Sequence, residues 1–266
     1  MSYIEINDVD LHYGRDSGSG GDGGTLALAH ATLSIRQNEF VAVVGPSGCG
    51  KSTLLKLISG LIGPTRGGVR VGGEDVRKPL KNVGMAFQNS TLLPWRTVRD
   101  NVLLPLEIVE PYRSQPRSEM TAKRKRADDL LAAVGLGEFS ERMPWQLSGG
   151  MQQRAQLCRA LIHEPSILLL DEPFGALDAF TREELWSVLE NLWLRRKCTV
   201  ILVTHELREA VYLCDTVYVV SPRPGRIVAA CKVPFERPRT LDMTYKPEFV
   251  ELVHTCRHHI SLGNAS

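Results

Sequence analysis

A glycine-rich stretch at residues 45–53 has the residue types and spacing to bind phosphate. It follows the P-loop pattern, in which glycines let backbone N–H groups turn inward around phosphate oxygens. In this pattern Lys51 places a positive charge at the β- and γ-phosphates, and the Ser52 hydroxyl is suited to bind Mg²⁺. The sequence therefore predicts a nucleotide site formed by Gly45, Pro46, Ser47, Gly48, Cys49, Gly50, Lys51, Ser52 and Thr53.

The segments on either side are those that a P-loop needs. Residues 40–44 are an unbroken apolar run typical of a buried strand. Residues 52–59 have the pattern of a helix, and the N-terminus of a helix favours anions. The alternative is a glycine-rich turn without a ligand, and the strand–loop–helix context argues against it.

Two adjacent carboxylates follow the apolar run at residues 167–170. Because side chains alternate along a strand, we expect Asp171 and Glu172 to point in different directions. Asp171 is then suited to hold Mg²⁺, as a Walker-B aspartate does, and Glu172 to activate the attacking water as a general base. The alternative is a carboxylate pair that only caps the next turn.

A second candidate anion site lies at residues 147–152. Ser148 occupies the position of a helix N-cap, and Gly149 and Gly150 expose N–H groups beside a positive helix end. Two phosphate-binding segments in one chain suggest two copies that share nucleotides. The alternative is an ordinary N-cap followed by a flexible turn.

Composition narrows the class of protein. The 266 residues are 43% hydrophobic and 23% charged, which is ordinary for a globular protein, and the net charge of +2 gives no general case for nucleic-acid binding. The six cysteines form no C-x-x-C pair, which indicates reduced thiols in a cytosolic protein. We expect no signal peptide and no membrane span, because no apolar run approaches about 20 residues.

Strands and helices alternate along the chain, which predicts an α/β fold. It is a P-loop NTPase core with a mostly parallel sheet, a small antiparallel β subdomain and an inserted helical subdomain. The residues from 97 to 134 should be helical, with a break at 110–116. Strands are expected at 2–13, 26–35, 39–44, 69–71, 83–87, 167–170, 200–203, 217–220 and 227–233, with the glycine turn at 72–73 joining 69–71 to 83–87.

Taken together, the motifs resemble those of the ATP-binding subunit of ABC transporters, in the same order and over almost the whole chain. The corresponding positions are Walker A at 45–53, the Q-loop at Gln88, the signature at 147–152, Walker B at 167–172, the D-loop at 175–178 and the switch histidine at His205. Tyr13 stands where that family places an aromatic that stacks on adenine.

The resemblance implies one ABC domain over residues 1–266, with a helical subdomain near 88–160 and C-terminal strands and helix at 221–266. It also implies a head-to-tail dimer that closes on ATP and reopens after hydrolysis. The implied site residues are, as catalytic groups, Glu172, His205 and Gln88; as Mg²⁺ ligands, Ser52, Gln88 and Asp171; and, acting across the dimer, Ser148, Gly149, Gly150 and Asp178.

Within the family, the chain is similar to the nitrate/sulfonate/taurine importer group. The implied partners are transmembrane permease subunits, an external solute-binding protein acting indirectly, and a second ATP-binding subunit, with no nucleic acid. The implied location is peripheral, on the cytoplasmic face of the inner cell membrane. The alternatives are an exporter or lipid-trafficking ATPase, and a non-transport ATPase acting on nucleic acid or ribosomes.

The segment 88–101 is expected to receive a helix of the permease through an apolar patch of Leu92, Leu93, Pro94 and Trp95. The alternative for Trp95 is a place in the core. Two segments depart from the family pattern: a glycine-rich loop at 14–24 and a polar insertion at 111–126. The basic residues 123–126 are either a solvated helix face or a contact for anionic lipid headgroups. Cys256, His258 and His259 are expected to be tail surface rather than a zinc site.

Overall fold

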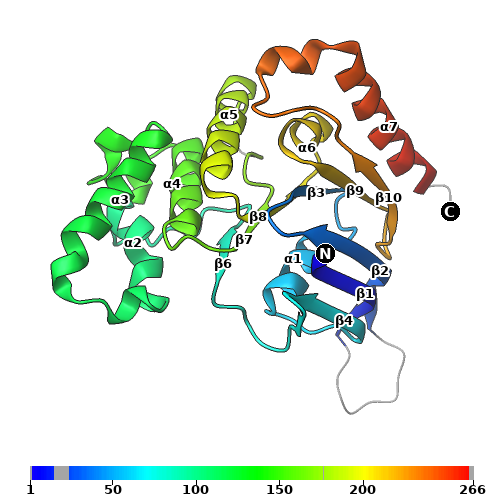
Figure 1. The fold of residues 1–266 in the computed structure, drawn as a ribbon, viewed down its shortest axis with the longest axis horizontal. Helices are drawn as coiled ribbons and strands as arrows, with labels where there is room; N and C mark the ends of the chain where they lie inside the picture. Colours follow the sequence, from blue (N-terminus) through cyan, green and yellow to red (C-terminus); the bar gives the residue numbers. More distant parts are fainter. Residues whose placement is uncertain (1, 15–23, 176, 264–266) are drawn as a thin grey trace. The chain divides into compact units, whose positions relative to one another are not determined.

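The computed structural model describes residues 2–14, 24–175 and 177–263 (Figure 1). The chain forms two compact units, one of residues 1–80 and 199–266 and the other of residues 81–198, which are described here in turn. The predicted loop at 14–24 lies almost entirely outside the described residues. The division into a single domain with a helical subdomain at 88–160 stays a prediction.

An antiparallel sheet opens the first unit. Its strand order is β2-β1-β4-β5, with β1 at Ser2–Tyr13, β2 at Thr25–Arg36, β4 at Arg66–Val71 and β5 at Glu74–Asp75. The alternating apolar residues of β1 explain its position, because Ile4, Ile6 and Leu11 are all buried. The predicted link was wrong in one detail: the turn at Gly72 and Gly73 joins β4 to the short strand β5, which the sequence pattern does not reveal.

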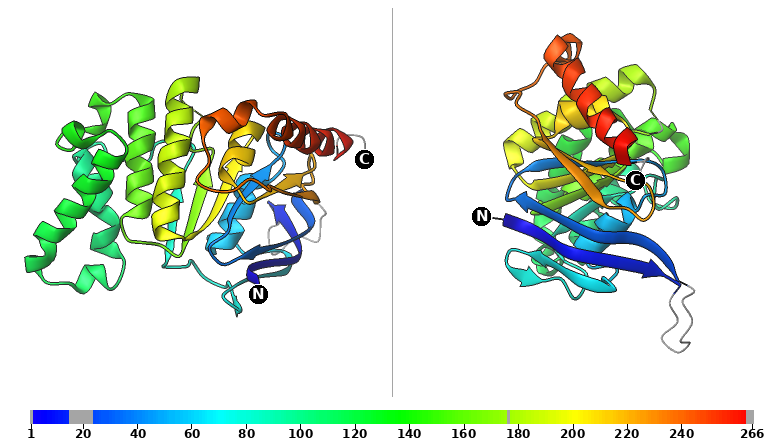
Figure 2. Two further views of the ribbon diagram at one scale, coloured as in Figure 1. Left: turned by 45° about the horizontal axis from the view of Figure 1, so that its top comes forward. Right: turned by 90° about the vertical axis from the view of Figure 1, so that its right-hand side faces the viewer.

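Mostly parallel strands form the second layer of this unit. β3 (Phe40–Val44) pairs in parallel with β8 (Thr199–Thr204) and β9 (Thr216–Val220), and β10 (Ile227–Lys232) runs antiparallel to β9. All five residues of β3 are buried, as its apolar sequence predicts. The helices of the unit are α1 (Lys51–Ser59), α6 (Leu207–Leu213) and α7 (Pro247–Gly263), preceded by the 3₁₀ turn η5 at Leu241–Tyr245. Both α6 and α7 pack on β9 (Figure 2).

The second unit joins a two-stranded parallel ladder to a cluster of helices. β6 (Val83–Ala86) pairs with β7 (Ile167–Asp171), and α2 (Val98–Ile108), α3 (Met120–Ala133) and α4 (Gly149–Leu161) pack together. The predicted helical break is confirmed, because α2 ends at Ile108. The remaining elements are α5 (Ala179–Arg196) and the 3₁₀ turns η1 (Tyr112–Ser114), η2 (Arg117–Glu119), η3 (Gly137–Phe139) and η4 (Pro144–Gln146).

All six cysteines are free and buried. None of the helices in the described ranges is both long and apolar enough to cross a bilayer.

Candidate nucleotide-binding site

The P-loop connects the end of β3 to the start of α1. Gly50 is the N-cap of α1 with φ 100°, and a Cβ there would lie 2.7 Å from Cδ2 of Leu28. At Gly45 a Cβ would lie 2.6 Å from the carbonyl oxygen of Val220. Both glycines are therefore required by the backbone path of the loop, as the P-loop pattern predicts.

The side chain of Lys51 is held against this loop. It is 6% exposed, and its Nζ donates hydrogen bonds of 2.8 Å to the carbonyl oxygens of Gly45 and Pro46. The ammonium group is thus fixed at the mouth of the turn, where the backbone N–H groups would surround a phosphate.

Tyr13 lies beside the same helix. Its hydroxyl oxygen is 3.1 Å from Oγ1 of Thr53, and its side chain is 40% exposed. The ring is therefore tied to α1 at its hydroxyl end, and the sequence pattern alone did not reveal this contact. An exposed aromatic face next to a P-loop suits the stacking role predicted for Tyr13.

His205 emerges at the same sheet edge as the P-loop. β3 and β8 are parallel neighbours, and Val44 pairs with Thr204 in their register. Gly45 and His205 therefore follow the carboxyl ends of adjacent strands, which is the edge where open α/β sheets bind ligands.

In the second unit, the strand alternation predicted for Asp171 and Glu172 ends at Asp171. β7 ends at Asp171, and Glu172 has φ 46°, in the left-handed region that non-glycine residues rarely adopt. The backbone therefore turns at Glu172, directly after the strand ends. Such backbone strain in a residue with a side chain is common at functional sites.

Gln88 and Glu172 are in direct contact. Nε2 of Gln88 donates a 3.0 Å hydrogen bond to Oε2 of Glu172. The contact follows from topology, because β6 and β7 are parallel and Ala86 pairs with Leu170, so both residues leave the same edge of the ladder. The amide nitrogen faces the carboxylate, which leaves Oε1 of Gln88 as a possible metal ligand.

The 147–152 segment begins α4, as predicted. Ser148 is its N-cap, and Oγ accepts a 3.3 Å hydrogen bond from the backbone N–H of Met151. A Cβ at Gly150 would lie 2.5 Å from Cδ2 of Leu177, so this segment adjoins the turn that leads into α5. Asp178 is the N-cap of α5, and the backbone N–H of Thr181 lowers the pKa of its carboxyl.

The predicted magnesium ligands have the right chemistry. The Ser52 hydroxyl, the Asp171 carboxylate and the Gln88 amide oxygen are hard oxygen donors of the kind that Mg²⁺ prefers, usually together with water and phosphate oxygens. Over the described part of the chain, no three or more His, Cys, Asp or Glu side chains gather into a cluster that could hold a metal by themselves. Cys256 is 0% exposed, so the expectation that it lies on the tail surface was wrong.

The predicted apolar patch is present with one correction. Trp95 is 71% exposed, so the alternative that it belongs to the core was wrong. Leu92 is only 9% exposed and belongs to the core instead of the patch. Pro94 is exposed, and the backbone N–H of Leu93 donates a hydrogen bond to Oδ1 of Asn101.

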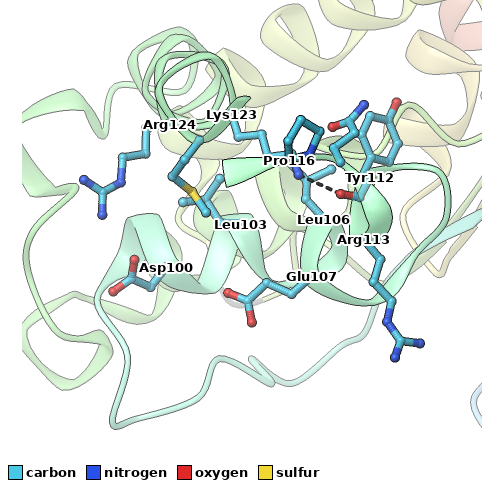
Figure 3. Close-up of a pocket in the computed structure, with 11 residues that line it drawn as sticks. Asp100, Leu103, Leu106, Glu107, Tyr112, Arg113, Pro116, Lys123 and Arg124 are labelled. Atoms are coloured by element: carbon cyan, nitrogen blue, oxygen red, sulfur yellow. Dashed lines mark hydrogen bonds between the residues drawn. The ribbon is translucent and has the colours of Figure 1, made fainter. Parts of the chain in front are cut away.

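A cavity of about 440 Å³ lies between α2, η1 and the start of α3 (Figure 3). Leu103 and Leu106 of α2 give it an apolar floor, and charged side chains of both signs surround the floor. The sequence pattern does not reveal this cavity, although Leu103 and Leu106 have the i, i+3 spacing of one helix face. Its lining residues are Asp100, Leu103, Leu106, Glu107, Tyr112, Arg113, Gln115, Pro116, Met120, Lys123 and Arg124.

Most of the basic residues at 123–126 are engaged within the chain. Lys123 donates to the carbonyl oxygen of Tyr112 at 2.6 Å. Lys125 pairs with Asp129 at 2.7 Å, and Arg126 with Glu164 at 3.0 Å. These contacts favour the interpretation as a helix face with local pairings over a dedicated lipid contact.

Comparison with known proteins gives a consistent result. A family model described as ABC transporter matches residues 28–175. The aliphatic sulfonates import ATP-binding protein SsuB of Bacillus licheniformis is 44% identical, over 81% of this chain and 82% of its own. The nitrate import ATP-binding protein NrtD of Synechococcus elongatus is 42% identical, over 85% and 82% respectively.

A solved structure agrees with these relatives. A dimeric ATP-binding cassette in a post-hydrolysis state, bound to ADP and Pi, has a TM-score of 0.75 and 32% identity, and the match covers 88% of this chain and 100% of that one. The fold class predicted from the sequence, a P-loop NTPase core with antiparallel and helical parts, is confirmed.

Proposed function

This chain belongs to the ABC transporter family as an ATP-binding, ATP-hydrolysing subunit, and we propose that it drives an importer of small solutes. The observation that carries the proposal is the likeness to SsuB and NrtD, both named as import ATP-binding proteins, over more than four fifths of this chain. An exporter or lipid-trafficking ATPase would use the same chemistry, so the names of these two relatives, and not the site, favour an importer.

The proposed solute is a small one of the nitrate, sulfonate or taurine type. Support comes from the names of the relatives, which include a bicarbonate transport ATP-binding protein, CmpD of Synechocystis, 42% identical over 81% of this chain and 75% of its own. The choice among such solutes would be made by the membrane and binding-protein subunits, because these contact the solute.

In the proposed mechanism the P-loop N–H groups and Lys51 bind the phosphates of ATP. Glu172 accepts a proton from the attacking water, and the hydrogen bond from Gln88 orients its carboxylate. His205 would bind the terminal phosphate. Mg²⁺, held by Ser52, Asp171 and Gln88, would supply positive charge to the phosphate oxygens.

We propose that two copies, or this chain and a paralogue, close on two nucleotides. The segment formed by Ser148, Gly149 and Gly150 would bind the γ-phosphate of ATP on the partner copy through N–H groups at the start of α4. Asp178 adjoins this segment through Leu177 and would connect the two sites. Because the closed state needs the γ-phosphate, hydrolysis would reopen the dimer.

The proposed membrane partner is a pair of permease subunits, with an external binding protein acting through them. The exposed Trp95 and the cavity beside Leu103 and Leu106 offer an apolar surface for an amphipathic helix of the permease. The chain would thus lie peripherally on the cytoplasmic face of the inner membrane.

The proposal is tested by reconstitution. The chain is co-expressed with candidate permease subunits, placed in proteoliposomes, and given a candidate binding protein loaded with nitrate, an alkyl sulfonate, taurine or bicarbonate. ATP hydrolysis should rise several-fold with one loaded binding protein, and labelled solute should move from the side of the membrane that holds the binding protein to the side that holds the ATPase. Solute movement away from the ATPase side, or turnover that ignores every loaded binding protein, would contradict an importer.

A further inference from the structure

A polar side chain is buried in the middle of α4. Gln156 is 1% exposed and lies between the buried residues Ala155 and Leu157. An amide in such a place costs free energy unless its donors and acceptors find partners. The partners of Gln156 therefore show what its side chain holds in position.

These partners belong to the segment that carries Gln88. Nε2 of Gln156 donates a 2.5 Å hydrogen bond to the carbonyl oxygen of Phe87, and its Oε1 accepts a 2.8 Å hydrogen bond from the backbone N–H of Thr91. The hydroxyl of Thr91 donates to the same Oε1 at 3.3 Å. The amide thus joins the two ends of the stretch 87–91, and Gln88 lies between them.

The stretch 87–91 forms neither a helix nor a strand, so the ladder of bonds in regular structure does not hold its backbone. Gln153, three residues before Gln156 in α4, donates a 3.3 Å hydrogen bond from Nε2 to the carbonyl oxygen of Gln88. Nη1 of Arg159 donates to the carbonyl oxygen of the last residue of the stretch at 2.8 Å. The stretch is therefore anchored to α4 on both sides of the Gln88 side chain.

The position of this stretch limits where the Gln88 side chain can reach. Its Nε2 donates the 3.0 Å hydrogen bond to Oε2 of Glu172, the proposed base. We propose that Gln156 is a positioning residue for ATP hydrolysis, which closes the stretch 87–91 so that Gln88 orients the carboxylate of Glu172. The inference rests on the roles proposed above for Gln88 and Glu172, and Gln156 acts only through them.

An apolar side chain of similar length separates these hydrogen bonds from packing. Gln156→Met keeps most of the buried volume but removes the bonds to both ends of the stretch, so hydrogen–deuterium exchange at the backbone N–H of Thr91 should become several-fold faster. Because Gln88 is then less well positioned, kcat of ATP hydrolysis should fall by about tenfold to a hundredfold. The KM for ATP should change by less than about twofold, because the P-loop belongs to the other compact unit and is unaltered.

Two comparisons separate positioning from a general loss of stability. Arg196→Met removes a 2.9 Å hydrogen bond from Nη1 of Arg196 to the carbonyl oxygen of Leu161, the last residue of α4. It should lower Tm, as Gln156→Met does, but leave kcat and the exchange at Thr91 unchanged. In a Gln88→Ala background, Gln156→Met should cause little further loss of kcat, because the effects of residues that act through one another do not add.

Wild-type kcat or unchanged exchange at Thr91 in Gln156→Met would overturn the proposal, as would losses that add fully to those of Gln88→Ala. If Gln156→Met does not fold, Gln156→Glu takes its place, because it keeps an acceptor for Thr91 and loses the donor to Phe87. It should also lower kcat without additivity. A wild-type chain that releases no phosphate from ATP would overturn the proposed function and this inference with it, whereas the other results overturn the inference alone.

Discussion

Glu172 combines two features that are rare in an ordinary turn residue. Its backbone has φ 46°, and its carboxylate accepts a hydrogen bond from Gln88. A left-handed conformation at a residue with a side chain costs of order 1 kcal/mol or more and persists only where the surroundings impose it. The turn directs the carboxylate to the Q-loop residue, which is the geometry that a positioned base requires.

We expect Glu172→Gln to lower ATP hydrolysis by about 10² to 10⁴-fold, because a glutamine cannot accept the proton of the attacking water. ATP binding should persist, since the P-loop is unchanged, and the dimer should accumulate in its closed form. Phosphate release measures the first effect and light scattering with Mg²⁺ and ATP the second. The matched control is Glu138→Gln at an exposed position. Wild-type turnover in Glu172→Gln would show that another group is the base.

At the scale of elements, two helices begin with the same kind of cap. Ser148 caps α4, and Thr97 caps α2 by accepting a 3.1 Å hydrogen bond from the backbone N–H of Asp100. Each cap should stabilise its helix by about 1 kcal/mol. Only Ser148 is proposed to contact nucleotide on the partner copy.

The two caps therefore form a matched pair. Ser148→Ala and Thr97→Ala should each lower thermal stability by a similar small amount. In the Glu172→Gln background, Ser148→Ala should also weaken ATP-dependent dimerisation several-fold, whereas Thr97→Ala should not. The measurements are the Tm and the ATP concentration at half-maximal dimer. Equal dimerisation in both variants would reduce Ser148 to an ordinary N-cap.

A buried carboxylate connects several strands of the first unit. Glu39 is 5% exposed, and it accepts hydrogen bonds from Oγ1 of Thr216 at 2.7 Å and from the backbone N–H of Arg36 at 2.8 Å. Burial works against ionisation, but these hydrogen bonds and the charge of Lys232 outweigh it and lower the pKa of Glu39. Because the folded pKa is lowered, the stabilisation is present above the ordinary carboxyl pKa and is lost as pH falls through the folded value.

We expect Glu39→Gln to lower the free energy of unfolding at pH 7 by about 1 to 3 kcal/mol, the scale of hydrogen bonds to a charged group. The deficit relative to wild type should begin to shrink below about pH 4, where the carboxyl of the unfolded chain becomes protonated, and should disappear below the lowered pKa of the folded protein. Denaturation of both proteins at pH 7 and below pH 4 measures the difference in the free energy of unfolding. Glu74→Gln, at an exposed position, is the control. An equal deficit at both pH values would mean that packing, and not charge, accounts for the loss.

An element could be predicted from the sequence when the residues that determine it lie close together in the chain. The apolar run of β3 and the N-cap at Ser148 are local, and β3 and the start of α4 lie within one residue of their predictions. β5 was missed because a strand of two residues, Glu74 and Asp75, has no periodicity. The contact of Gln88 with Glu172 joins residues distant in sequence, so spacing does not reveal it.

At the scale of the whole molecule, the residues predicted to bind and hydrolyse ATP are distributed over the two compact units. The P-loop and His205 belong to the unit of residues 1–80 and 199–266, whereas Gln88, Ser148 and Glu172 belong to the unit of residues 81–198. The second unit also carries the exposed Trp95 and the cavity at α2. A partner that docks on this unit therefore contacts the same compact body that holds the proposed base, which is a physical basis for coupling transport to hydrolysis.

Docking should depend on Trp95 above the other exposed aromatics. A tryptophan side chain buries a large apolar area when a partner covers it, and such residues commonly dominate interfaces. Trp95→Ala should weaken the complex with the permease subunits by about 2 kcal/mol or more, roughly thirtyfold in Kd, as measured by titration against permease in nanodiscs. Tyr245→Ala, at a residue that is 72% exposed in the first unit, is the control and should leave Kd unchanged. Equal affinity of Trp95→Ala and wild type would show that Trp95 is not part of the permease contact, and would place that contact outside the segment 88–101.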